Sequence, residues 1–187
     1  FNIPLEKVTK QQRSHAKIVN FGIIYGVSAF GLSNQTDLNI KESKSLIETY
    51  YLKYPKLKQF IEKQISFARD KGYVETILGR RRILRDINST NSVVRSAAER
   101  NAVNAPVQGS AADIIKMSMI NIQKEFISKK IKSKMLLQIH DELVFDVFKP
   151  ELNQVMEIVR YQMENTFKLD IPLSVDINYG VNWLEAH

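Results

Sequence analysis

The chain has 187 residues, of which 44% are hydrophobic and 25% are charged, and this composition indicates a folded protein and excludes a disordered tail. The absence of cysteine excludes disulfide frameworks, zinc–cysteine clusters and thiol nucleophiles, and three histidines leave little metal chemistry beyond carboxylates. The formal net charge of +7 favours a polyanionic partner, and no apolar run is long enough to span a membrane.

The first predicted element is a helix that begins after Thr9 and ends at Gly26. Thr9 and Gln12 have the spacing of a capping box, and a glycine commonly ends a helix. Side chains four residues apart share one helix face about 18 Å long. Cations bind phosphate oxygens and aromatic rings stack on bases, so two cations followed by two aromatics predict a nucleotide site. The alternative is an ordinary amphipathic helix with a basic rim. The four residues on this face are Arg13, Lys17, Phe21 and Tyr25.

Residues 28–72 predict further helical segments. A short turn of helix is expected within residues 28–36. An amphipathic helix follows, because Asn39 and Glu42 form a second capping-box pattern, and it extends to about Lys53. Pro55 suits the first turn of another helix, which is expected to end at Gly72. The first 72 residues are therefore predicted to form an all-helical lobe.

After Gly72 the chain changes character. Residues 73–77 and 80–84 predict a hairpin with a basic second strand. A polar loop at residues 88–91 precedes a helix over residues 93–104, which we expect to break at Pro106. Ser110 with Asp113 predicts the cap of a second helix that reaches about Ser128. Four lysines follow this helix: Lys129, Lys130, Lys132 and Lys134.

The last part of the chain predicts a second hairpin, a helix and a final strand. Apolar strands at residues 135–139 and 143–148 flank His140, Asp141 and Glu142. A helix is expected over residues 151–168 and a strand over residues 173–179. The predicted fold class is α+β, with a helical lobe followed by a lobe of antiparallel strands and packed helices.

Two adjacent acids, Asp141 and Glu142, lie between the two apolar strands of the second hairpin. Carboxylates held near an apolar sheet need a compensating cation, hydrogen-bond donor or metal. Mg²⁺ prefers one or two carboxylates together with substrate phosphates, so the pair predicts a magnesium site that also carries a phosphate. The alternative is an exposed hairpin turn with solvated acids.

Three blocks of the chain resemble family A DNA polymerases. Residues 13–26 resemble the fingers helix of that family, and residues 95–113, which contain Asn-Ala-Pro-Val-Gln-Gly at 104–109, resemble a helix region of its palm. Residues 140–142 resemble its catalytic hairpin, and the order and spacing of the blocks also match. The resemblance covers essentially the whole chain. It implies a fragment of a right-hand polymerase fold, with a fingers subdomain at 1–72 and the C-terminal part of the palm at 73–187.

The resemblance also implies roles for individual residues. Lys17 is expected to serve as general acid to the leaving pyrophosphate, and Phe21 to pack on the sugar. His140 is expected near the primer end. Arg100, Asn104 and Gln108 also have structural alternatives, because the arginine could pair with an acid and the two amides could cap a break at Pro106. The implied nucleotide-binding residues are Arg13, Lys17, Phe21, Tyr25 and Gly26; the DNA-binding residues are Arg95, Arg100, Asn104, Gln108 and His140; the catalytic residues are Asp141, Glu142, Lys17 and His140; and the metal ligands are Asp141 and Glu142.

The function implied by the resemblance is template-directed DNA synthesis in replication and repair. A primer 3′-hydroxyl attacks the α-phosphate of a deoxynucleotide, and pyrophosphate leaves. The implied partners are primer–template DNA and dNTPs but no membrane, and the implied cofactor is a pair of Mg²⁺ ions. The whole protein is expected to be a monomeric, cytoplasmic, nucleoid-associated bacterial enzyme. An organellar origin stays open, because the Lys, Asn and Ile bias is typical of an AT-rich genome.

One part of the family's metal site has no counterpart in the sequence. The family's first catalytic aspartate lies in a strand upstream of the fingers helix, and two-metal catalysis needs it. The chain starts on Phe1 rather than Met, so we expect a piece of a longer protein that is nearly inactive by itself. The competing interpretation is a non-catalytic nucleic-acid-binding module that uses residues 80–82 and the lysines near 130. The candidate substitutes for the aspartate, none in a matching motif, are Asp86, Asp113, Asp146 and Asp176.

Overall fold

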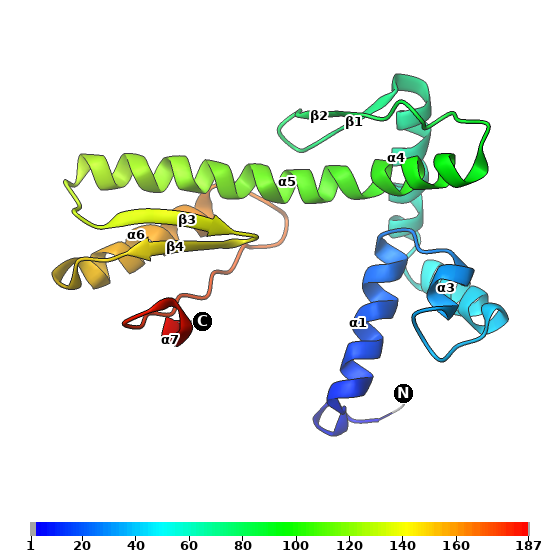
Figure 1. The fold of residues 1–187 in the computed structure, drawn as a ribbon, viewed down its shortest axis with the longest axis horizontal. Coiled ribbons are helices and arrows are strands. Elements are labelled where there is room, and N and C mark those ends of the chain that lie inside the picture. The colour runs from blue at the N-terminus through cyan, green and yellow to red at the C-terminus, as the bar shows by residue number, and fades with distance from the viewer. Residues whose placement is uncertain (1–2, 187) are drawn as a thin grey trace. The chain divides into compact units, whose positions relative to one another are not determined.

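The computed structural model of the chain describes residues 3–186. These residues form two compact units, the first ending at Val107 and the second beginning at Gln108. Helices predominate in both units, and the two sheets are small antiparallel hairpins (Figure 1). The predicted α+β class is therefore confirmed. No helix among the described residues has the length and apolar content needed to cross a bilayer.

The helices that open the first unit begin and end where the capping signals predict. Thr9 N donates to Gln12 Oε1 at 3.0 Å and Gln12 N donates to Thr9 Oγ1 at 3.2 Å, which completes the predicted capping box. Gly72 ends its helix with a φ of 76°, a conformation that a glycine adopts without steric cost. The elements are η1 (Leu5–Lys7), α1 (Lys10–Ile24), α2 (Ala29–Ser33), α3 (Ile40–Lys53) and α4 (Pro55–Lys71).

The first hairpin pairs β1 (Tyr73–Glu75) with β2 (Arg81–Ile83). Both strands are shorter than predicted, because residues 76–80 form a turn in which Thr76 N donates to Arg80 O at 3.0 Å. Arg81 forms an ion pair with Glu75 at 2.8 Å, so part of the basic strand is neutralised within the hairpin. The hydrophobic core of this unit joins α4, the hairpin and α5 through Ala68, Val74, Leu84, Ile87, Ala98, Ala102 and Ala105.

Helix α5 (Ser92–Ser128) is continuous through Pro106, so the predicted break is wrong. A proline inside a helix removes one backbone hydrogen bond and costs about 3 kcal/mol. Packing on both sides offsets this cost, because the residues before Pro106 lie in the first core and Ile122 and Phe126 lie in the second. Ser110 is buried within the helix and does not cap it.

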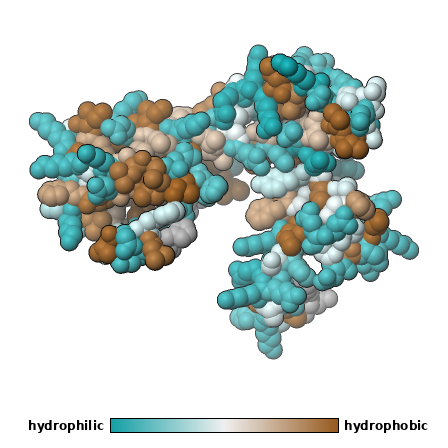
Figure 2. All heavy atoms as spheres, viewed as in Figure 1, coloured by the Kyte–Doolittle hydropathy of each residue, from teal (hydrophilic) through white to brown (hydrophobic). Residues whose placement is uncertain are grey.

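The second unit packs α6 (Leu152–Asn165) and a hairpin against the C-terminal half of α5. The hairpin pairs β3 (Lys134–Ile139) with β4 (Glu142–Asp146), and η2 (Lys149–Glu151) and α7 (Trp183–Ala186) complete the unit. Leu143 and Phe145 pack against a core made by Ile122, Phe126, Val155, Ile158 and Val159. Leu136 and Leu137 of β3 stay about half exposed, and Figure 2 shows apolar side chains among hydrophilic ones over this hairpin.

Residues 173–179 are not a strand, so this prediction is wrong within the described chain. The segment is held by side chains of α6, because Arg160 Nη1 donates to Val175 O at 2.7 Å and Val175 N donates to Glu164 Oε1 at 3.1 Å. Ile177 also packs against the second core. An extended segment that faces a helix shows the same alternation of apolar residues as a strand, which explains the error. Helix α6 also ends at Asn165, earlier than the predicted Lys168.

Glu151 fixes the loop that connects α5 to β3. Its carboxylate accepts hydrogen bonds from Lys132 N at 3.0 Å, Ser133 N at 2.9 Å and Ser133 Oγ at 2.7 Å. Ser133 Oγ accepts in turn from Phe148 N at 3.0 Å. The backbone N–H of Lys132, followed by the Ser133 hydroxyl, holds the pKa of Glu151 below its ordinary value of 4.5. This carboxylate therefore stabilises the loop in its ionised form.

We expect Glu151→Gln to lower the unfolding midpoint at neutral pH, and this difference to shrink as the pH falls below 4.5. A group with a depressed folded-state pKa stabilises the fold above its unfolded pKa and loses this contribution as the pH falls through the folded pKa. Thermal unfolding of both proteins at a series of pH values measures the difference. Glu157→Gln, an exposed acid on α6, is the control. A difference that is the same at every pH would contradict the prediction.

Candidate functional site

A pocket of about 670 Å³ lies beside α1 in the first unit. Helix α1 and the residue that follows it contribute Lys17, Phe21 and Tyr25 to its lining. Helix α5 contributes Arg100 and Asn104, which are far from α1 in the sequence. The structure therefore brings together five of the predicted site residues, from two of the three sequence blocks.

The aromatic pair of α1 is arranged to offer flat apolar surface to this pocket. The rings of Phe21 and Tyr25 lie 6.2 Å apart between centroids and are inclined by 12°. Phe21 is 54% exposed, which is high for so large an apolar side chain. Aromatic faces of this kind accept sugars and bases by packing and stacking.

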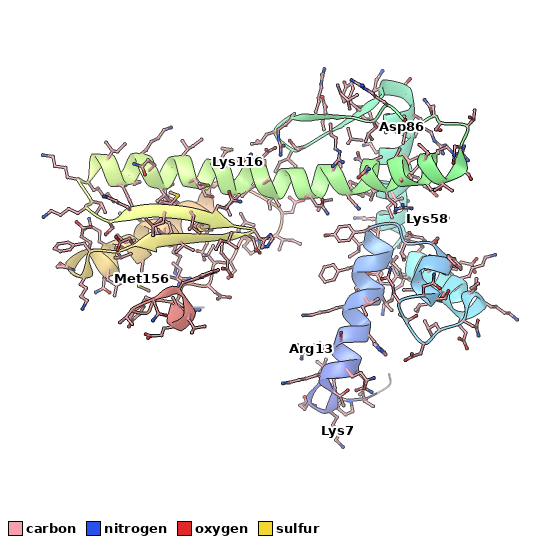
Figure 3. The ribbon with its side chains drawn as sticks, in the orientation of Figure 1. Lys7, Arg13, Lys58, Asp86, Lys116 and Met156 are labelled. Atoms are coloured by element: carbon pink, nitrogen blue, oxygen red, sulfur yellow. The ribbon has the colours of Figure 1, made fainter. Side chains whose placement is uncertain are left out.

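The two predicted phosphate-binding cations lie on α1 one turn apart. Lys17 lines the pocket, whereas Arg13 does not and lies nearer the start of the helix (Figure 3). Both side chains are exposed, and among residues 3–186 neither one forms an ion pair. Their charges are therefore available to an anionic ligand.

Gly26 and Arg100 approach each other at the edge of the pocket. Gly26 has a φ of 75°, and a Cβ at this position would lie 3.9 Å from Arg100 Cγ. The alternative that Arg100 pairs with an acid has no support, because its guanidinium makes no ion pair within the described residues.

Asn104 and Gln108 do not cap a helix break, because α5 continues past both. Asn104 Oδ1 is buried, and no hydrogen-bond donor reaches it among residues 3–186. An unsatisfied buried acceptor costs about 1–3 kcal/mol, so this amide is not explained by the fold alone. Gln108 is exposed and is the first residue of the second unit.

Arg95 has structural contacts that the sequence did not predict. Its Nη1 donates to Ser89 O at 2.8 Å, and its Nε lies 3.9 Å from Glu99 Oε1. The bond to Ser89 ties the start of α5 to the preceding loop, and the contact with Glu99 lies within α5. A guanidinium has five N–H donors, so several stay available to another partner.

The carboxylate pair lies at the tip of the second hairpin. Ile139 and Glu142 are cross-strand partners, so His140 and Asp141 form a two-residue turn. His140 has a φ of 53°, and Gln138 Nε2 donates to its carbonyl oxygen at 2.8 Å. Gln138 was missed by the sequence analysis, because its partner is a backbone oxygen of the turn, which no sequence pattern indicates.

Asp141 and Glu142 are both exposed. An exposed turn is compatible with the predicted magnesium site and with the alternative of solvated acids, so both interpretations stay predictions. No group of three or more histidine, aspartate or glutamate side chains forms a possible metal site within residues 3–186. Two adjacent oxygen donors still fit Mg²⁺, which takes its other ligands from phosphates and water. The four candidate substitutes, Asp86, Asp113, Asp146 and Asp176, add no such cluster.

Comparisons with known proteins agree on one family. The model of DNA polymerase family A matches residues 1–185. DNA polymerase I of Streptococcus pneumoniae (strain ATCC BAA-255 / R6) is 48% identical over 181 residues, which cover 97% of this chain and 21% of that protein. DNA polymerase I of Caldicellulosiruptor bescii is 44% identical over 186 residues, which cover 100% of this chain and 22% of that protein.

The fold is also similar to a solved structure. The POL domain of Pol1 from M. smegmatis, in complex with DNA primer-template and dNTP, matches with a TM-score of 0.94 and 41% identity. The match covers 100% of this chain and 33% of that one. The chain spans about a fifth of the length of the curated relatives it matches, as the shares of 21% and 22% show.

Proposed function

This chain belongs to DNA polymerase family A, and on that basis we propose that the protein containing it carries out template-directed DNA synthesis. The reaction transfers a deoxynucleotide to a primer 3′-hydroxyl and releases pyrophosphate, in DNA replication and repair. The observation that carries the proposal is the pocket beside α1, where a cation, two aromatic rings, an arginine and an amide line one space of about 670 Å³. The Pol1 relative in complex with primer-template and dNTP supports the same partners.

The incoming nucleotide lies along α1 in this proposal. Arg13 and Lys17 bind the triphosphate through charge-assisted hydrogen bonds, and Phe21 packs on the sugar. Tyr25 and Gly26 border the templating base pair. Lys17 also protonates the pyrophosphate as it leaves, because a lysine near the β-phosphate can donate a proton where negative charge develops.

The DNA is held by residues of α5 and by the hairpin tip. Arg100, Asn104 and Gln108 contact the duplex near the new base pair, mostly through the minor groove, and His140 lies near the primer end. The unsatisfied acceptor of Asn104 supports a polar role beyond the fold. Arg95 contacts the DNA backbone through those guanidinium N–H groups that do not donate to Ser89.

Asp141 and Glu142 hold magnesium in this proposal, with a second carboxylate strand supplied by another part of the protein. When bound, the metal ions stabilise the negative charge that develops on the transferred phosphate. Residues 1–72 form the fingers subdomain and residues 73–187 the C-terminal part of the palm. We infer that the protein acts as a monomer, in the bacterial cytoplasm and associated with the nucleoid.

Primer extension tests the proposed function. The full-length protein, given a primer–template, Mg²⁺ and dNTPs, is expected to extend the primer according to the template. The isolated 187 residues are expected to be slower by about 10³-fold or more, because half of the two-metal site is missing. A folded full-length protein that binds primer–template but never extends it would contradict the function. Metal-dependent extension by the isolated chain at the full rate would contradict the divided metal site.

A further inference from the structure

A second pocket, of about 700 Å³, lies in the second unit near the start of β3 and the end of β4. Strand β3 runs from Lys134 to Ile139, so this pocket lies about 20 Å along the hairpin from the His140–Asp141 turn. We call it the lysine pocket. The lining residues that matter here are Lys132, Lys134, Lys149, Ser133, Asp146 and Phe148.

The lysines of this pocket project from a fixed loop. Ser133 is 5% exposed and is bonded to Glu151 and to Phe148 N, so the backbone between α5 and β3 is held in place. These bonds use the backbone of Lys132 and not its ammonium group. A fixed backbone reduces the ordering cost of binding, because fewer torsions are lost when the side chains meet a ligand.

Positive charge dominates the lining. Lys132, Lys134 and Lys149 make no ion pair within residues 3–186. Asp146 is the one acid in the lining and is the cross-strand partner of Lys134, while Glu151, just outside it, is occupied by backbone donors. Lys129 and Lys130 precede the loop, and Lys129 is paired with Glu125 at 3.1 Å. The pocket therefore attracts anions, with some opposition from Asp146 and from the ionised carboxylate of Glu151.

An exposed aromatic ring accompanies these cations. Phe148 is 49% exposed, and Lys132 Nζ lies 5.2 Å from its ring centroid. Proteins that bind single-stranded nucleic acid combine cations that follow the backbone with aromatic rings on which bases stack. An acidic protein segment would pair with the lysines, but contact with the Phe148 ring would add little to its binding free energy.

We propose that the lysine pocket binds a single DNA strand, with its three lysines on successive phosphates and Phe148 against a base. The proposal rests on the proposed function for its choice of partner, but it uses none of the residues assigned to nucleotide or metal binding. A strand has one phosphate per about 3.4 Å of helix axis, so a segment of about six nucleotides covers the distance from the pocket to the hairpin turn.

Lysine acetylation followed by mass spectrometry tests the proposal at the level of single residues. The full-length protein is labelled with and without an oligo(dT) strand, in chelator and without dNTPs. We expect the strand to reduce labelling of Lys132, Lys134 and Lys149, and to leave Lys41, Lys56 and Lys63 of α3 and α4 unchanged. Replacing all three pocket lysines by glutamine is expected to reduce the log–log salt slope for oligo(dT) by about 2, because each single-strand contact contributes about 0.7.

A matched variant with glutamine at Lys41, Lys56 and Lys63 makes the same change of net charge and is expected to keep the slope. No protection of the pocket lysines, or an equal change of slope in both variants, would overturn the proposal. Equal or stronger protection by polyglutamate would also overturn it, in favour of an acidic protein partner. Primer extension by the same protein separates the two proposals. Extension without protection of the lysines would contradict only the proposed strand binding by the lysine pocket, and protection without extension would contradict only the proposed polymerase function.

Discussion

Asp141→Asn in the full-length protein is expected to reduce primer extension by about 10³- to 10⁴-fold, while primer–template binding stays within about threefold. The amide keeps the size of the carboxylate but loses its charge, so a magnesium ligand becomes a poor one. The fold should not suffer, because Asp141 is exposed at the tip of a hairpin and packs in neither core. The loss therefore reports on the chemistry and not on stability.

Single-turnover extension and DNA titration of the same preparation measure the two quantities. Asp170→Asn, the same change at an exposed position of the second unit, is the control and should extend normally. A higher Mg²⁺ concentration should recover part of the activity of Asp141→Asn, because it compensates a weakened metal site. Equal extension by wild type and Asp141→Asn would remove this residue from the metal site.

Lys17→Ala is expected to slow nucleotide incorporation by about 10²- to 10³-fold, with a much smaller change in duplex affinity. Negative charge on the pyrophosphate grows in the transition state, so a cation that meets it there affects the rate more than binding. Lys17 lines the pocket from α1 and is exposed, and the alanine variant should therefore fold normally.

Lys17→Arg distinguishes charge from proton donation. Arginine keeps the positive charge but is a poor proton donor, since its pKa lies well above that of lysine. Recovery of the wild-type rate in Lys17→Arg would reduce the role of Lys17 to electrostatic binding. Lys10→Ala, an exposed lysine at the start of α1 outside the pocket, is the control. Equal losses of rate and of duplex affinity in Lys17→Ala would indicate a docking residue.

Local signals predicted the helical part of the fold well. The caps at Thr9 and Asn39 and the glycine at 72 act within one turn, and the structure forms all three as the sequence indicates. The predicted helix break at Pro106 is wrong, because packing of α5 at both ends outweighs the local cost of a proline inside a helix. The strand predicted over residues 173–179 is wrong, because an alternation of apolar and polar residues does not reveal whether a segment pairs with a strand or lies against a helix.

The candidate site was predicted only in part. The spacing on α1 was sufficient to place Lys17, Phe21 and Tyr25 on one pocket, because helix geometry is regular. The contribution of Arg100 and Asn104 to that pocket depends on tertiary packing and was not predicted, because the family resemblance implied only that both residues bind DNA. The apolar residues on either side of Asp141 do not predict its exposure, because a two-residue turn projects beyond the strands that it connects. The bond from Gln138 to the turn has no signature in the sequence.

The positive φ of His140 also limits which residues this position can accept. A side chain in the left-handed region costs on the order of 1 kcal/mol, and a β-branched one costs more. Among substitutions, glycine and asparagine fit the backbone, whereas valine and isoleucine oppose it whatever their chemistry. A library randomised at this codon and selected only for folding would therefore already be enriched in a few residue types. Selection for activity would then act only on the residue types that the backbone conformation at this position accepts.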